Sequence, residues 1–183
     1  MESIKAVDEK TIFKYGQRYN ITVKDSYKVD TAYFSFLLSL DTTKNREQIK
    51  NHYQPLQALY YIREGNLQSF HVNCYASGFP NLKWDKEGAF NTFIPKQQAQ
   101  LDSIVPLVTQ LNFLVPLSQT EIISSTDYEY VIVVHWSRFM GRQSKRLIKI
   151  VQENAKLSLA EKIRVIYANN DNIQFLTQKN GSR

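Results

Sequence analysis

The chain has 183 residues, of which 43% are apolar and 22% charged. These values are ordinary for a globular protein, and the length suits one domain or one domain with a substantial extension. Glycine and proline are scarce, which excludes long flexible linkers and low-complexity tracts. The formal charge of +6 permits an acidic partner but does not require one, because the basic residues are mostly dispersed among acidic ones.

No apolar run is long enough to cross a bilayer, and the opening residues Met1–Lys5 lack the apolar core of a signal peptide. The compartment is therefore unknown, and a periplasmic or cell-envelope location fits if a precursor segment has been trimmed. The single cysteine, Cys74, cannot form an internal disulfide. It gives no evidence for or against an oxidising compartment.

The first segments of the chain predict short strands. Residues 11–24 alternate around Gly16 and indicate a hairpin, and residues 32–40, rich in Phe and Leu, indicate a strand. Asp41 and the two threonines after it then offer capping side chains for a short helix over 44–53.

The clearest hairpin signal lies in residues 56–76, where two β-rich runs flank the turn Glu64-Gly65-Asn66. Residues 82–95 predict a shorter strand or a packed loop. Residues 97–113 carry apolar side chains at helical spacing and predict a helix, which Pro106 would kink or break.

The most regular pattern in the chain is a strand, a helix and a strand over residues 130–171. Residues 130–134 are apolar at every position, which is typical of a strand covered on both faces in a mostly parallel sheet. A helix is predicted over 141–156 from one apolar stripe, and a second strand over 162–168. This order of elements predicts a right-handed parallel unit.

The first strand runs into the helix through the sequence Trp136-Ser137-Arg138-Phe139-Met140-Gly141-Arg142-Gln143-Ser144-Lys145. It resembles the active-site segment of thioredoxin-like proteins of the periplasmic thiol–disulfide oxidoreductase type. There a hydrophobic strand leads into Trp-Ala-x-Trp-Cys-x-x-Cys, a basic residue and a long helix. Met140 and Gln143 fall on the two cysteines of that pattern, and Asp171 matches the acidic end of the second strand.

The resemblance implies an α/β fold with a thioredoxin-like or related core over residues 97–183. An N-terminal antiparallel β-rich region, 1–96, would extend the sheet or pack on it, unless both parts form a single domain. Only residues 172–183 follow Asp171, and none is proline. The domain is therefore truncated, or permuted with the N-terminal hairpin supplying the missing strands, or another α/β fold that shares one such unit.

The same resemblance disfavours thiol–disulfide oxidoreductase activity. That chemistry needs a thiolate nucleophile and a resolving sulfur. Met140 supplies only a thioether and Gln143 no sulfur at all. The predicted protein is a redox-inactive member of the group that binds a partner.

The start of the predicted helix at Gly141 is the candidate ligand-binding site. Its N–H groups and the positive end of the helix dipole favour an anion. The candidate residues are Ser137, Arg138, Arg142, Gln143, Ser144, Lys145 and Arg146. They predict contact with a protein partner, an acidic peptide or a small anion, and a solvated basic face is the competing interpretation. An enzyme handling an anionic substrate and a structural cell-envelope protein are the alternative functions.

Strand alternation over residues 69–76 separates the one thiol from the nearest histidine. It places Cys74 on an apolar, buried face, while Ser69, His71, Asn73 and Tyr75 share the opposite face. We therefore expect no Cys–His nucleophilic pair, a structural thiol, and a polar face that either is half solvated or serves as a recognition surface.

The remaining signals argue against a metal and against nucleic acid. The three histidines are scattered without ligand spacing, and we expect no metal and no cofactor. The basic cluster carries only Trp136 and Phe139 as aromatic neighbours, and both fit the core better than a stacking surface. The run from Asn169 to Asn172 lies at the carboxyl end of a predicted parallel strand, where open α/β sheets bind ligands, or forms a turn.

Overall fold

The computed structural model of the chain describes residues 5–78, 80–118 and 125–181. These residues form a six-stranded mixed sheet in the order β3–β2–β5–β6–β1–β4. The strands are Ser26–Val29 (β1), Gln57–Ile62 (β2), Leu67–Val72 (β3), Leu114–Pro116 (β4), Tyr130–Trp136 (β5) and Ile163–Asn169 (β6). The fold is therefore mixed α/β, as the sequence predicts.

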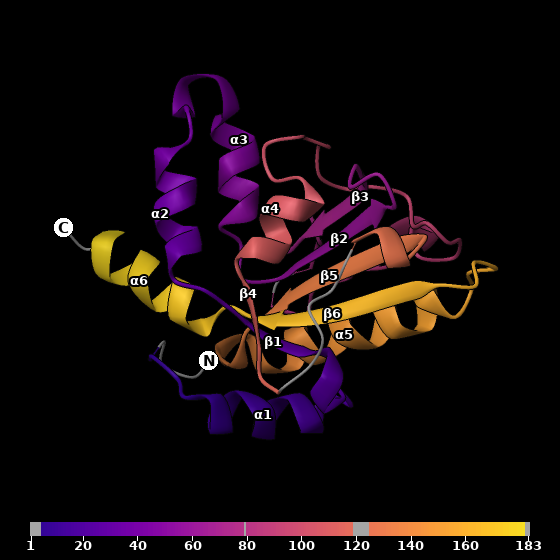
Figure 1. Cartoon of the computed structure of the whole chain (residues 1–183), viewed down its shortest axis with the longest axis horizontal. Helices are drawn as coiled ribbons and strands as arrows, with labels where there is room; N and C mark the ends of the chain where they lie inside the picture. The colour runs from indigo at the N-terminus through magenta and orange to yellow at the C-terminus, as the bar shows by residue number, and fades with distance from the viewer. Residues whose placement is uncertain (1–4, 79, 119–124, 182–183) are drawn as a thin grey trace.

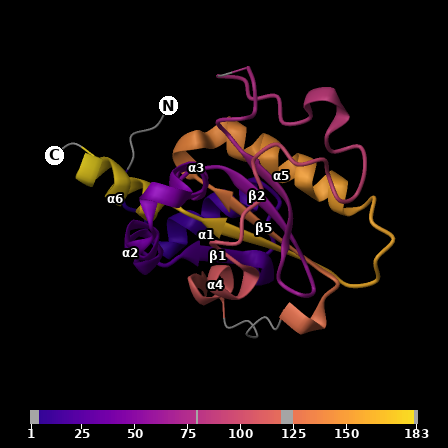
Figure 2. The ribbon, with the colours of Figure 1, turned by 90° about the horizontal axis from the view of Figure 1, so that it is seen from above.

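Helices cover both faces of the sheet (Figures 1 and 2). The α-helices of the described residues are Glu9–Arg18 (α1), Ala32–Ser39 (α2), Thr42–His52 (α3), Leu107–Asn112 (α4), Gly141–Ala155 (α5) and Asp171–Gly181 (α6). Short 3-10 turns occur at Val23–Asp25 (η1), Lys86–Gly88 (η2), Ser125–Asp127 (η3) and Arg138–Met140 (η4). Figure 1 shows α1 and α5 below the sheet and α2, α3 and α4 above it.

Each face of the sheet carries its own buried core. The core on the α2 side joins side chains of α2, α4 and α6 to one side of the strands, and the other core joins α1, α5 and the segment 76–94 to the opposite side. Successive residues of β5 point into opposite cores. Val131 and Val133 pack in one core, and Ile132 and Val134 pack in the other. This explains why every residue in the middle of β5 is apolar.

The strand–helix–strand prediction for residues 130–171 is confirmed. β5 and β6 are parallel, paired from Tyr130 with Ile163 to Trp136 with Asn169. α5 connects them and buries Leu147, Ile148 and Val151 completely. Removing such a stripe from water provides most of the stabilisation of a surface helix.

The predicted central hairpin is also present. β2 and β3 are antiparallel, and β2 pairs antiparallel with β5 along its whole length. Gly65 occupies the turn with φ of 83°, a backbone conformation that glycine adopts without steric cost. The helix expected at 44–53 is present as α3, whose start Asp41 caps by accepting a hydrogen bond from the Thr43 amide.

The hairpin predicted over 11–24 and the strand predicted over 32–40 are wrong, because residues 9–18 and 32–39 form helices. Asp8 caps α1 by accepting a hydrogen bond from the Thr11 amide, and Ile12 and Gly16 lie one turn apart against the sheet. Residues 32–39 form α2, and Asp30 accepts the amide of Ala32 at its start. A short apolar run fits a buried helix as well as a strand, so its composition cannot decide between them.

The predictions for residues 82–113 are partly wrong. Only residues 107–112 of the expected helix are helical, because Pro106 stands at the N-cap and the preceding residues are irregular. Residues 82–95 form a packed loop with η2, the second of the two expectations, with one isolated bridge between Ser77 and Lys83.

The sheet contains two strands, β1 and β4, that the sequence patterns did not predict. β1 pairs parallel with β6 and antiparallel with β4. The first 96 residues thus supply β1, β2 and β3 to the same sheet as β5 and β6, together with three helices. This region is less rich in strands than expected, and one of its strands is parallel to its neighbour.

Candidate functional site

The candidate site lies at the carboxyl ends of β5 and β6. The two helices that follow these neighbouring strands pack on opposite faces, since α5 belongs to one core and Ile173 of α6 to the other. The connections that follow Trp136 and Asn169 therefore leave the sheet toward opposite faces (Figure 1). In open α/β sheets, ligands bind at such a point.

The carboxylate of Asp171 lies at the carboxyl ends of these two strands. It is only 2% exposed. It accepts hydrogen bonds from the Ser137 hydroxyl, from the Arg138 amide at 3.0 Å and from Asn169 Nδ2 at 3.1 Å. Arg138 Nε lies 4.0 Å from Asp171 Oδ2. A carboxylate of the chain itself thus binds the Arg138 amide, just before the start of α5 where we expected an external anion.

Three of the predicted site residues hold the backbone together. Ser144 Oγ donates to the Ser137 carbonyl at 2.6 Å and accepts from the Ser137 amide at 3.2 Å. The Gln143 side chain donates to the carbonyl of Pro80 and accepts from the Leu82 amide at 3.1 Å. All three side chains are buried, so their polar atoms serve internal contacts.

The other predicted residues are basic, and they separate into two groups. Arg138 is largely buried beside Asp171, with its guanidinium 5.9 Å from the centre of the Tyr15 ring. The remaining three are exposed and lie on one side of the first two turns of α5, at positions i, i+3 and i+4. We call Arg142, Lys145 and Arg146 the α5 basic face.

The charge of the α5 basic face is not balanced within α5. The first turn of α5 contains no acidic residue. Arg146 Nη1 donates to the Asn81 side chain at 3.3 Å, which is a neutral acceptor. Among the described residues, no carboxylate forms an ion pair with these three side chains. The structure therefore brings together three of the seven predicted residues as an accessible surface.

A second polar cluster lies inside the core on the α2 side. His52 Nε2 is 3.2 Å from both carboxylate oxygens of Asp102, and the two side chains are 0% and 5% exposed. Nearby, Gln110 Nε2 donates to His135 Nε2 at 2.9 Å. Burial, followed by the charge of His52, lowers the pKa of His135 to about 3. His135 is therefore a neutral acceptor.

The His52–Asp102 pair has the composition of a general base and its orienting carboxylate. Substrate cannot reach it in this structure because both side chains are buried. The pair joins α3 to that irregular segment, and we assign it a structural role. Its two members are 50 residues apart, so no local sequence pattern indicates the contact.

The expected polar face on β3 is wrong as a recognition surface. Ser69 and His71 are completely buried, hydrogen-bonded to each other at 3.0 Å, and the His71 ring lies 4.4 Å from that of Phe90. Burial lowers the pKa of His71 to about 4. Loop 82–95 covers this face of β3, and no local sequence pattern predicts that contact.

The expectation of a buried cysteine is also wrong. β3 ends at Val72, so strand alternation stops before Cys74, whose side chain is exposed. Partial desolvation raises the pKa of its thiol. We expect native protein to react with one equivalent of the thiol reagent DTNB without denaturant, but more slowly than free cysteine, because less thiolate is present. Reaction only after unfolding would contradict the exposed position.

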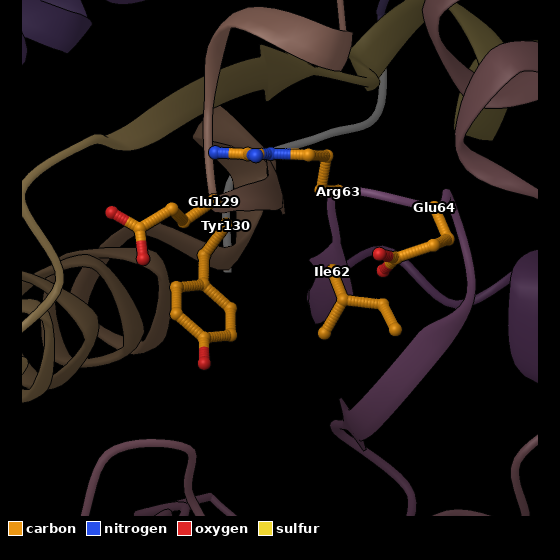
Figure 3. Close-up of a pocket in the computed structure, with 5 residues that line it drawn as sticks. All are labelled: Ile62, Arg63, Glu64, Glu129 and Tyr130. Carbon is orange, nitrogen blue, oxygen red and sulfur yellow. The ribbon is translucent and has the colours of Figure 1, made fainter.

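Surface cavities also lie elsewhere among the described residues. One, of about 250 Å³, is lined by Ile62, Arg63, Glu64, Glu129 and Tyr130 at the amino end of β5. Figure 3 shows the Arg63 side chain extended across the gap, with the two carboxylates on either side. Glu129 already accepts the amides of Glu161 and Lys162, at 3.0 and 3.4 Å. Another cavity lies between α5 and η1.

Within the described ranges, no three His, Cys, Asp or Glu side chains are grouped so that they could hold a metal ion. No helix found there is long and apolar enough to span a bilayer. No protein-family model, curated protein or solved structure matches the chain. A functional assignment must therefore come from the geometry of the chain itself.

Proposed function

We propose that this chain is a redox-inactive, thioredoxin-like binding protein whose α5 basic face contacts an acidic segment of a protein partner. The observation that carries the proposal is the separation of charge at the carboxyl end of β5. Asp171 accepts hydrogen bonds from the buried polar groups, while Arg142, Lys145 and Arg146 are exposed and form no ion pair with a carboxylate of the described residues.

The order of strands supports a thioredoxin-like arrangement in permuted form. The parallel β5–α5–β6 unit is flanked by the antiparallel hairpin β2–β3, which precedes it in the sequence and lies beside β5. Pro55 comes shortly before β2, and Asn170, at the end of β6, donates to its carbonyl at 3.1 Å. The peptide bond before Pro55 is trans, a departure from the cis-proline of that family.

The absence of a thiol at the helix start supports a binding role over catalysis. Met140 precedes α5, and Gln143 is fixed by its two hydrogen bonds to residues 80–82. We expect no acceleration of insulin reduction by dithiothreitol when the protein is added. Clear acceleration would contradict the redox-inactive assignment.

The spacing of the charges favours an extended acidic segment over a small anion. Side chains three and four positions apart on a helix have Cβ atoms roughly 5–6 Å apart, so Arg142 neighbours both Lys145 and Arg146 and the three cations form one broad patch. Asp171 already occupies the Arg138 amide where a single phosphate would bind. Cations near a helix N-terminus cost about 0.3–1 kcal/mol each, and an acidic partner would offset that cost.

The test compares two triple variants of equal charge. R142Q/K145Q/R146Q removes the α5 basic face, and K44Q/R46Q/K50Q removes three exposed cations from α3. The probe is fluorescein-labelled octaglutamate at low salt, followed by anisotropy. The α5 variant should raise Kd by roughly thirtyfold, because three rim contacts contribute about 2 kcal/mol together. The α3 variant should bind as the wild type does.

Added salt should weaken wild-type binding steeply, since exposed charges are screened over about 10 Å at 0.1 M ionic strength. Equal losses in the two triple variants would mean that net charge alone attracts the peptide. That result, or no binding by the wild type, would overturn the assignment of the α5 basic face.

A further inference from the structure

A second cavity lies at the far end of β6 from the α5 basic face. Its volume is about 520 Å³, within the range of roughly 300–1,000 Å³ typical of small-molecule sites. Three segments line this open cavity: residues 20–25, the last turn of α5, and β6 from Ile163 to Tyr167. The cavity is thus separate from the surface proposed above.

The floor of the cavity is apolar. Ala155, Ile163 and Val165 are half-buried and pack against the core below α5, and the ring of Tyr167 belongs to that core. An apolar part of a ligand placed here would leave water, at about 25 cal/mol per Å² of buried surface. The floor therefore favours a ligand with an apolar body.

One wall is a fixed, internally neutral ion pair. Arg164 Nη1 lies 2.5 Å from Asp25 Oδ1, and Arg164 Nη2 donates to the Lys24 carbonyl at 2.7 Å. Both side chains are mostly buried, so their charges cancel within the wall. Burial raises the pKa of Tyr167 to about 12, so its hydroxyl stays protonated and neutral at physiological pH.

The rim carries the charge that remains. Lys24 and Lys156 are exposed, and neither ammonium pairs with a carboxylate in the part of the chain that the structure describes. Lys156 also stands at the C-terminal end of α5, where a cation offsets the negative end of the helix dipole. The mouth of the cavity is therefore positive.

We propose that this cavity binds a small organic anion, an aromatic or short aliphatic carboxylate or sulfonate. The apolar body would lie on Ile163, Val165 and the Tyr167 ring, and the acid group would face Lys24 and Lys156. This site is independent of the α5 basic face, and either site can be present without the other.

The first experiment uses 8-anilinonaphthalene-1-sulfonate as a fluorescent probe on the folded protein. The variant K24Q/K156Q removes the rim charges, and its matched control K44Q/K50Q removes two lysines from α3. All four side chains are exposed, so both variants should fold. We expect the rim variant to raise the probe's Kd by about tenfold, and the control to leave it unchanged.

The second experiment tests the chemical class by displacement of the bound probe. 1-Naphthoate should displace it at concentrations about tenfold lower than 1-naphthamide, which has the same ring system without the charge. Equal displacement by both compounds, no binding of the probe, or equal affinity in wild type and rim variant would overturn the proposal. The variant R142Q/K145Q/R146Q should bind the probe normally, so failure of one site leaves the other testable.

Discussion

Replacing Asp171 with alanine should lower the free energy of unfolding by about 3–5 kcal/mol. The substitution leaves the Ser137 hydroxyl, the Arg138 backbone amide and the Asn169 side-chain Nδ2 without their shared acceptor. It also removes a carboxylate oxygen that lies 4.0 Å from Nε of the largely buried Arg138. Breaking a buried charged contact from one side costs this much because the groups left behind stay desolvated. Denaturant unfolding measures the loss.

Two further variants make this result specific. Asp171→Asn keeps an acceptor oxygen but loses the charge, and it should cost about half as much as the alanine variant. Glu161→Ala removes an exposed carboxylate and should change stability by about 0.5 kcal/mol or less. A loss below about 1 kcal/mol for Asp171→Ala would mean that Asp171 does not organise the carboxyl end of the sheet.

Acid should destabilise the fold steeply below pH 6.5 because of two buried histidines. The native pKa is about 4 for His71 and about 3 for His135, against an ordinary value of 6.5. Above pH 6.5 both are neutral in the folded and unfolded states. Below pH 6.5 both histidines become protonated in the unfolded chain, whereas they stay neutral in the native protein. Stability should therefore fall by about 2.7 kcal/mol per pH unit until the native pKa values are reached.

Single variants separate this effect from that of the carboxylates. His71→Gln and His135→Gln should each reduce the slope of unfolding free energy against pH by about 1.4 kcal/mol per unit between pH 6 and 5. The slope is informative even where a variant is less stable overall. Denaturant unfolding at a series of pH values gives it directly. Identical slopes in wild type and both variants would show that neither histidine is held neutral.

The centre of the fold could be predicted because its patterns are regular over many residues. A strand apolar at every position can satisfy two cores, as residues 131–134 do, and one apolar stripe along α5 specifies a helix against them. Shorter apolar segments lack this information. Residues 32–39 form a helix, at whose start Asp30 accepts the amide of Ala32.

The side chains of the candidate site also differ in whether the sequence predicts their positions. The outward position of Arg142, Lys145 and Arg146 follows from the apolar stripe on the opposite side of α5, so it could be predicted. The inward position of Ser137 and Gln143 could not. These side chains bond Asp171 and residues 80–82, which lie 34 and more than 60 residues away in sequence. Contacts of that range depend on the assembled sheet.

The position of β1 constrains the order in which the chain can assemble. β1 lies between β4 and β6, and its register joins Ser26 to Tyr167 near the other end of the chain. A nascent chain on the ribosome therefore cannot pair β1 with β6 until residues 163–169 have been synthesised. Such distant pairing slows folding and leaves strand edges open meanwhile. Chains that stop before residue 163 should consequently aggregate or require chaperones.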